Sequence, residues 1–377
     1  MSRIYLSPPH LSGLEKKYLH EALDSNWIAP LGPQVDSFED EMAEYLDIKA
    51  AVALSSGTAA LHLALKNSDV QSGDIVFCPS LTFSSSANVI LYENAIPVFI
   101  DVDPNTWNID CISLQRAITA CKENHKAPKA LITVDLYGQS SDYDNIMEIC
   151  NKNNITVIED AAEALGSEYK GAKCGTFGKA GILSFNGNKI VTTSGGGMLV
   201  SNDEKFVEQA RFLSAQAREP VIHYEHKELG YNYRMSNLLA AVGRGQLAVL
   251  DERVKSKQEI FSRYKSAIGD IEGIEFMPMA NYGKSNCWLT TLLIHEDIAG
   301  FNRDTVISAL EKENIESRPI WKPMHLQPLY KEFDYYESEQ GDISQMLFNK
   351  GICLPSGTSL SINDQEKIID IIQSIIR

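Results

Sequence analysis

The segment AVALSSGTAALHLALKN, residues 51–67, joins a short apolar run to an amphipathic run through small and hydroxyl-bearing residues. The first run has the length of a buried strand, and the second repeats its apolar residues at helical spacing. The same order recurs further along the chain, with strand-like runs at 74–80, 96–103, 129–138 and 155–160 and helix-like runs between them. Strands that alternate with helices in this way form a mostly parallel sheet covered by helices. The predicted fold class is therefore α/β.

Two further strand-like runs, at 181–186 and 196–203, extend this pattern, so we predict a large domain over residues 1–250. A long helical stretch, residues 238–268, is predicted to link it to the rest of the chain. Beyond residue 251 the pattern changes to strand, helix and strand and closes with a helix at 363–377. A chain of 377 residues exceeds the usual size of a single core. We therefore predict a smaller C-terminal α+β domain over residues 251–377.

Composition limits the classes of partner. Fifty acidic and 34 basic residues give a formal charge of −16, which repels a polyanion, so we expect no nucleic-acid partner. An anionic small molecule stays compatible with this charge, because a few backbone N–H groups can bind it locally. The N-terminus lacks the apolar region of a signal peptide, and no run of about 18 apolar residues could cross a membrane. We expect a soluble cytoplasmic protein.

Cysteine and histidine usage gives no metal or disulfide pattern. The seven cysteines are odd in number, widely spread and never in a CxxC pair. His223 and His226 lie three residues apart, but no third ligand stands near them in sequence. We predict neither a zinc site nor a disulfide framework.

Ligands in open α/β sheets bind beyond the carboxyl ends of the strands. Gly57 and Thr58 follow the first strand and open a helix, where a phosphate could bind; alternatively, Ser56 or Thr58 caps that helix. Phe83 follows the next strand and could stack on a flat ring, or it could be an ordinary packing aromatic. Asp160 ends the strand at 155–160 and could pair with a protonated ring nitrogen, or it could cap a helix starting at the next residue.

The stretch SFNGNKIVTTSGGG, residues 184–197, holds one lysine among glycines and hydroxyl residues. A Walker A loop requires Ser or Thr after its lysine and a helix beyond, whereas here Ile190 follows Lys189 and a strand-like run comes next. The dinucleotide fingerprint GxGxxG is also absent after the first strand. An amine, an anion site, a ring face and a carboxylate remain, and pyridoxal phosphate requires these four groups together.

At this point the chain resembles the sugar aminotransferases of the DegT/DnrJ/EryC1/StrS family, which are fold type I pyridoxal phosphate enzymes. The resemblance covers essentially the whole chain. It is carried by the segments SPPHLSG (7–13), SNWIAPLGP (25–33), SSGTAALHLAL (55–65), EDAAEALGS (159–167), SFNGNKIVTTSGGGM (184–198), GYNYRMSN (230–237), SRPIWKPMH (317–325) and GICLPSG (351–357).

The resemblance implies a role for each matching residue. Lys189 would bind the cofactor covalently and carry protons, and members with histidine at its position dehydrate their substrate instead of aminating it. The other implied cofactor contacts are Gly57, Thr58 and Ser184 with the phosphate, Asp160 with the ring nitrogen, Phe83 against the ring, Ala162 and Glu163 near its other face and hydroxyl, and Asn232 supplied by a partner subunit. Many relatives have glutamine where this chain has Glu163. A homodimer with shared active sites follows from the same resemblance.

The closest resemblance is to enzymes that aminate UDP-linked 4-keto-6-deoxy-N-acetylglucosamine with L-glutamate as donor. Candidate substrate contacts are Trp27, Arg234, Arg318 and His325, with Arg218 and Trp321 also considered and the proline-rich segment 27–33 as a loop over the sugar. Surface ion pairs, ordinary packing and a plain turn would explain the same residues. Three alternatives stay open: a dTDP- or GDP-linked sugar, a non-catalytic cofactor-binding regulator, and a purely structural turn at 184–197.

Overall fold

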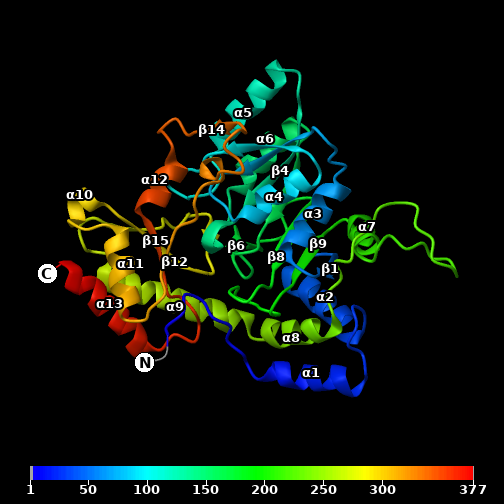
Figure 1. The fold of residues 1–377 in the computed structure, drawn as a ribbon, viewed down its shortest axis with the longest axis horizontal. Coiled ribbons are helices and arrows are strands. Elements are labelled where there is room, and N and C mark those ends of the chain that lie inside the picture. The colour runs from blue at the N-terminus through cyan, green and yellow to red at the C-terminus, as the bar shows by residue number, and fades with distance from the viewer. Residues whose placement is uncertain (1–2, 377) are drawn as a thin grey trace.

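The computed structural model describes residues 3–376, and its centre is an eight-stranded sheet (Figure 1). All its strands run parallel except β9, which is antiparallel to both of its neighbours. The predicted mostly parallel sheet is confirmed. In spatial order the strands are β1 (Ala50–Leu54), β9 (Gly197–Ser201), β8 (Ala180–Ser184), β5 (Thr156–Asp160), β4 (Pro128–Val134), β2 (Ile75–Pro79), β3 (Ile96–Ile100) and β14 (Tyr335–Tyr336).

Helices cover both faces of this sheet, because its strands are apolar on both sides. In β1, Val52 and Leu54 face one helical layer while Ala51 and Ala53 face the other. The first layer contains α3 (Gly57–Asn67), α4 (Ser84–Tyr92) and α7 (Glu204–Ser214). The second contains α2 (Pro33–Leu46), α5 (Cys111–Glu123), α6 (Tyr143–Lys152) and α8 (Asn237–Leu247), with α1 (Leu14–Asp24) packed on α8.

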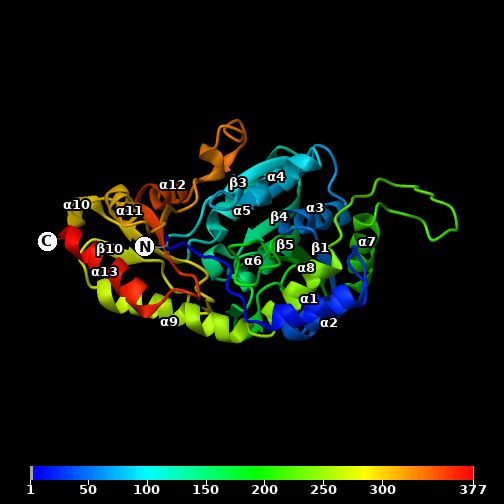
Figure 2. The ribbon, with the colours of Figure 1, turned by 60° about the horizontal axis from the view of Figure 1, so that its bottom comes forward.

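A second lobe is built on an antiparallel sheet of four strands, in the order β10 (Ile274–Phe276), β12 (Thr290–Ile294), β15 (Gly351–Leu354) and β13 (Arg318–Pro319). The helix α9 (Leu250–Ile268) leads to it from α8 and lies along the lower edge of Figure 2. The stretch predicted as one linking helix is thus two helices in succession. The remaining helices are α10 (Glu296–Ala299), α11 (Arg303–Lys312), α12 (Ile343–Lys350) and α13 (Ile362–Ile376), and a small third sheet joins β11 (Gly283–Lys284), β6 (Glu168–Tyr169) and β7 (Ala172–Lys173).

Two segments cross the predicted division between residues 250 and 251. Ile4 pairs with Ile315 in the second lobe, and β14 extends the large sheet beside β3. The division into 1–250 and 251–377 stays a prediction, and its outer bounds at residues 1 and 377 lie outside the described residues.

The segment 215–236 between α7 and α8 projects from the large lobe as a long arm (Figures 1 and 2). Ile222, Tyr224 and Leu229 on this arm are strongly exposed. Within residues 3–376, no helix combines the length and the apolar character that crossing a membrane requires.

Candidate functional site

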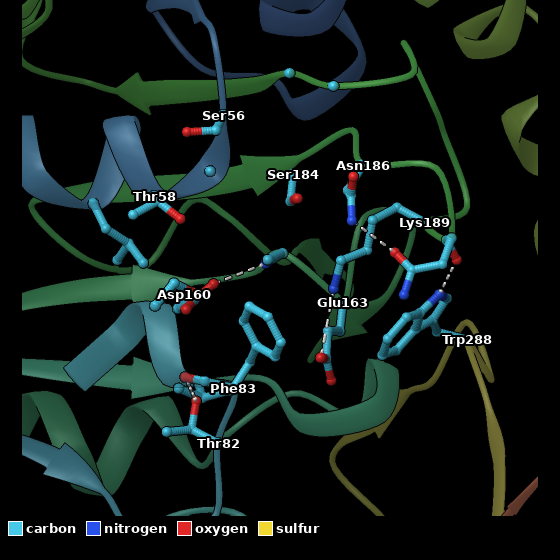
Figure 3. Close-up of a pocket in the computed structure, with 18 of the residues that line it drawn as sticks. Ser56, Thr58, Thr82, Phe83, Asp160, Glu163, Ser184, Asn186, Lys189 and Trp288 are labelled. Atoms are coloured by element: carbon cyan, nitrogen blue, oxygen red, sulfur yellow. Dashed lines mark hydrogen bonds and ion pairs between the residues drawn. The ribbon is translucent and has the colours of Figure 1, made fainter. Parts of the chain in front are cut away.

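A cavity of about 210 Å³ opens at the carboxyl ends of β1, β2, β5 and β8 (Figure 3). These ends lie close together because the strands are parallel neighbours, or next neighbours, in one sheet. The structure places eight of the predicted site residues on the cavity wall: Gly57, Thr58, Phe83, Asp160, Ala162, Glu163, Ser184 and Lys189. These eight residues therefore lie together, as the sequence predicts, while their individual roles toward the cofactor stay predictions.

The N-terminus of α3 forms one side of the cavity. Ser56 caps this helix, because its Oγ accepts a hydrogen bond of 3.0 Å from the N–H of Ala59. The alternative prediction, that Ser56 caps the helix, is therefore confirmed. Gly57 and Thr58 follow at positions where helix N–H groups lack intrahelical partners, so the cap at Ser56 does not exclude an anion there. A Cβ on Gly57 would lie 3.1 Å from Cβ of Ser184, which shows how tightly the helix start packs against the end of β8.

Asp160 lies buried at the end of β5. Its Oδ2 accepts a 2.7 Å hydrogen bond from Ser86, and its Oδ1 accepts one of 3.2 Å from the N–H of Ala162. No helix starts at Ala161 in the structure, so the alternative of a helix cap is wrong. Burial raises the pKa of Asp160, although these hydrogen bonds and Lys189 act in the opposite direction. A cationic partner in the cavity would favour the carboxylate.

Glu159, one residue earlier, points away from the cavity and accepts hydrogen bonds from the N–H groups of Gly175 and Phe177. It lies beside Asp135, and burial together with this carboxyl neighbour raises the pKa of Glu159. With Cys174 the two carboxyls form a buried group whose potential ligand atoms lie within 4.8 Å of one another. Glu159 and Asp160 are adjacent in β5, yet only Asp160 lines the cavity.

Lys189 extends into the cavity from the turn after β8. Its Nζ lies 3.5 Å from Oε1 of Glu163 and 4.0 Å from the ring centroid of Trp288. The other oxygen of Glu163 accepts a 2.7 Å hydrogen bond from the N–H of Tyr137. Burial raises the pKa of Glu163, and the nearby Lys189 opposes that change. The amine of Lys189 therefore lies between the carboxyl group of Glu163 and the indole face of Trp288.

Aromatic side chains form another part of the cavity wall. Phe83 is half-exposed, and its ring centroid lies 5.4 Å from that of Trp321 in an edge-to-face arrangement. Such a half-exposed ring can cover a flat ligand without rearranging the core.

A second cavity, of about 680 Å³, adjoins the first, and Asn188, Trp288 and Trp321 line both. Its wall includes the N-terminal segment 5–9 and the segment 316–322 of the second lobe. Arg318 lines this cavity with a largely exposed side chain, while its Nε and Nη2 bond Glu316 at 3.1 and 2.9 Å.

Two predicted substrate residues have structural partners instead. Arg234 is 5 % exposed in its side chain and donates hydrogen bonds to Glu39 and to the carbonyl of Ala53, away from both cavities. Both ring nitrogens of His325 are occupied, Nδ1 by Ser80 at 2.7 Å and Nε2 by Asp342 at 3.0 Å. Neither residue lines either cavity, so the structure gives their predicted substrate contacts no support.

Trp27 and Asn232 also lie outside the two cavities. Trp27 is half-exposed in the turn after α1, where its carbonyl accepts a hydrogen bond from Asn237. Asn232 is exposed at the base of the arm, where its backbone pairs with Ala215. This exposure is compatible with a partner subunit's use of Asn232, which stays a prediction.

The sequence interpretation missed Ser85, Asn186, Asn188 and Trp288, which also line the first cavity. Asn186 and Asn188 both come shortly before Lys189 in the sequence. Their closeness to Lys189 was the signal that could have identified them as site residues. Trp288 lies about 100 residues later at the start of a strand pattern, where nothing in the sequence places it beside Lys189.

The donor set fits pyridoxal phosphate. A helix N-terminus with two hydroxyls suits its phosphate, a buried carboxylate suits its ring nitrogen, an exposed aromatic suits its ring, and a lysine amine suits its aldehyde. The cradle is narrow, because a Cβ on Gly197 would lie 2.3 Å from the N–H nitrogen of Gly57.

Comparison with known proteins agrees with this geometry. Residues 9–373 match the model of the DegT/DnrJ/EryC1/StrS aminotransferase family. EpsN of Bacillus subtilis, provisionally named a pyridoxal phosphate-dependent aminotransferase, is 54% identical over 98% of this chain and 95% of its own. GDP-perosamine synthase of Caulobacter vibrioides is 36% identical over 100% of this chain and 99% of its own.

A transaminase of Campylobacter jejuni, named for UDP-4-amino-4,6-dideoxy-N-acetyl-β-L-altrosamine, is 30% identical over 95% of this chain and 97% of its own. Among solved structures, the PLP form of Spr1654 from Streptococcus pneumoniae, provisionally named a sugar aminotransferase, superposes with a TM-score of 0.90. It is 27% identical and covers 99% of this chain and 98% of its own.

Proposed function

Because the chain belongs to the DegT/DnrJ/EryC1/StrS family of pyridoxal phosphate-dependent sugar aminotransferases, we propose that it aminates C4 of a nucleotide-linked 4-keto-6-deoxy sugar. The donor is L-glutamate, the acceptor is UDP-linked 4-keto-6-deoxy-N-acetylglucosamine, and the product is the UDP-4-amino sugar. The observation that carries the proposal is the position of Lys189 Nζ in one cavity with the start of α3 and Asp160.

Each wall residue has a defined task in this proposal. The start of α3 and Ser184 bind the phosphate, Asp160 pairs with the ring nitrogen, and Phe83 covers the ring. When bound, the cofactor would supply an aldehyde carbon that takes the donor's amino group and passes it to the sugar, and an electron-withdrawing ring that stabilises the carbon from which a proton is removed. Lys189 Nζ would move a proton from the α-carbon of the donor to C4′ of the cofactor, and in the second half of the cycle from C4′ to C4 of the sugar. The surrounding aromatic side chains exclude water from these transfers.

The second cavity supports a nucleotide-linked substrate. A sugar in the first cavity would place the attached diphosphate and nucleoside in the larger space beside Trp321. Arg318 and Lys322 lie there as cations for the diphosphate, and the walls are mainly apolar, as a base requires. The name of the Campylobacter jejuni relative supports a UDP-linked sugar.

A GDP-linked 4-keto sugar is the second candidate, because GDP-perosamine synthase is 36% identical along the whole chain. The deciding experiment incubates the enzyme with glutamate and UDP-, GDP- or dTDP-linked 4-keto sugars and identifies the products by NMR. Preference for the UDP substrate supports the proposal, and preference for another nucleotide replaces it.

The same preparation tests the two non-enzymatic alternatives. Visible absorbance that borohydride bleaches, with the cofactor mass recovered on the Lys189 peptide, excludes a structural turn. Cofactor binding without turnover of any keto sugar would instead favour a regulator.

We further propose a homodimer in which the partner subunit's Asn232 completes the phosphate site. The exposed side chains of Ile222, Tyr224 and Leu229 on the arm and the exposed position of Asn232 support this arrangement. Mixing inactive Lys189→Ala with inactive Asn232→Ala should restore about a quarter of the activity, since half the dimers are mixed and each has one intact site. No recovery after verified subunit exchange would refute shared sites.

A further inference from the structure

The indole of Trp288 faces the amine of Lys189. The distance from Nζ to the ring centroid is 4.0 Å, and the carboxylate of Glu163 lies 3.5 Å from the same nitrogen. The side chain of Lys189 is 12 % exposed, and Trp288 is 1 % exposed as a residue. Little water therefore competes for either contact. The amine has two attractive partners that come from different lobes of the molecule.

The indole is held in this orientation from two sides. Its Nε1 donates a 2.9 Å hydrogen bond to the carbonyl of Asn188, the residue before Lys189. Its ring also stacks on Tyr137, with centroids 6.3 Å apart and planes inclined by 18°. Rotation of the ring would break both contacts. Trp288 is thus fixed to the same turn that presents the lysine.

Hydrogen bonds also hold the backbone of Trp288 in place. Its N–H donates to Oδ1 of Asn286, and Nδ2 of Asn286 donates to the carbonyls of Glu163 and Leu165, each at 2.9 Å. Nζ of Lys257 donates hydrogen bonds of 2.9 and 2.8 Å to the carbonyls of Trp288 and Ser356. Asn286 therefore connects the two partners of Lys189 through one buried amide.

An amino-group transfer requires such a holding site. While the cofactor carries the amino group, Lys189 is not attached to it, and its flexible side chain could adopt many rotamers. Proton transfer in both directions needs the amine within hydrogen-bond reach of the reacting carbon. An aromatic face attracts an ammonium ion, and burial strengthens that attraction.

We propose that Trp288 is a positioning residue which, together with Glu163, holds the amine of Lys189 whenever that amine is not bound to the cofactor. This inference rests on the proposed function, because it takes Lys189 as the reactive lysine. It assigns Trp288 a role that ordinary core packing would not require.

The first test needs no activity. Lys189 is dimethylated with ¹³C-formaldehyde in the cofactor-free protein, which keeps its charge, and its methyl signals are recorded by NMR. Methyl groups above an indole face shift upfield. We expect this shift in the wild type, a smaller one in Trp288→Phe, and none in Trp288→Leu. Absence of the shift in the wild type overturns the inference even if the leucine variant does not fold.

The second test measures the glutamate half-reaction in a single turnover. Loss of a buried cation–π contact should lower the limiting rate of Trp288→Leu about 5- to 30-fold, equivalent to about 1–2 kcal/mol. The glutamate concentration for half-maximal rate should stay within about twofold, and Trp288→Phe should lose less. A leucine variant at the wild-type rate refutes the positioning role.

Trp107→Leu is the matched control, because Trp107 is buried to the same degree in the same apolar cluster but does not line the cavity. It should alter neither the methyl shift nor the half-reaction. Borohydride labelling of Lys189 separates the two proposals: label on Lys189 with no rate loss refutes only the role of Trp288, whereas no label on Lys189 in the wild type refutes the proposed function as well.

Discussion

Gly197→Ala tests whether the spacing between β9 and the start of α3 sets cofactor affinity. Gly197 is the first residue of β9, and its backbone pairs with Leu54 and Ser184. A Cβ at this position would lie 2.3 Å from the nitrogen of Gly57 and 2.4 Å from the carbonyl carbon of Ser56. Normal contacts between such atoms are about 3.5 Å, so the helix start would have to move by about 1 Å.

The expected losses of folding stability and of cofactor affinity follow from that displacement of the helix start. Over-packing of this kind costs about 1–3 kcal/mol of folding stability. A shift of about 1 Å also removes at least one hydrogen bond between the helix N–H groups and a bound phosphate, worth about 1.5–3 kcal/mol for a charged acceptor. Affinity for pyridoxal phosphate should therefore fall about 10- to 150-fold.

Gly187→Ala is the control, because a Cβ on Gly187, in the turn beside Lys189, meets nothing within 4 Å. Both variants would be titrated with pyridoxal phosphate at equilibrium, followed by the visible absorbance of the bound cofactor. Equal affinities in the two variants would show that the close approach of Gly197 to Gly57 does not shape the phosphate site.

Three further outcomes are expected. Asp160→Asn should lower turnover about 150- to 5,000-fold in a steady-state assay, because a buried charged pair worth about 3–5 kcal/mol is lost; turnover near the wild-type value would exclude the ring-nitrogen role. Arg318→Ala should raise the KM for the nucleotide sugar about tenfold without changing the KM for glutamate, since only one cation of the second cavity is removed. Burial lowers the pKa of Lys257 to about 7. Above pH 7 the unfolded chain therefore binds more protons than the folded chain, so Lys257 makes the free energy of unfolding increase as the pH rises. The unfolding free energy of Lys257→Met, measured against wild type between pH 7 and 8.5, should lack that contribution; parallel pH curves would contradict the lowered pKa.

The cofactor side of the site could be predicted from sequence because it is made of strand ends. Gly57, Phe83, Asp160 and Ser184 each follow or end a strand of the parallel sheet, and one topological rule brings those ends together. The resemblance then supplied the individual roles. Local sequence also identified the cap at Ser56 correctly, since caps depend only on neighbouring residues.

The substrate side could not be predicted in the same way, because it depends on partners far away in the chain. Arg234 was expected to be a free clamp, but Glu39 binds it, 195 residues away. His325 was expected to contact the sugar, but Ser80 and Asp342 occupy its two nitrogens. A charged or polar residue near a motif is available to a ligand only if no distant side chain pairs with it, and sequence spacing does not contain that information.

The two cavities are lined mainly by different parts of the chain, and this bears on the choice of substrate. The proposed cofactor contacts come from the large sheet, whereas the second cavity is lined by residues 5–9 and by residues 316–322 of the second lobe. Relatives named for UDP- and for GDP-linked sugars match almost the whole of this chain, so one fold accommodates different nucleotides. If the nucleotide lies in the second cavity, substitutions in these two segments should change nucleotide preference while leaving cofactor affinity intact, because no residue of either segment except Trp321 reaches the first cavity.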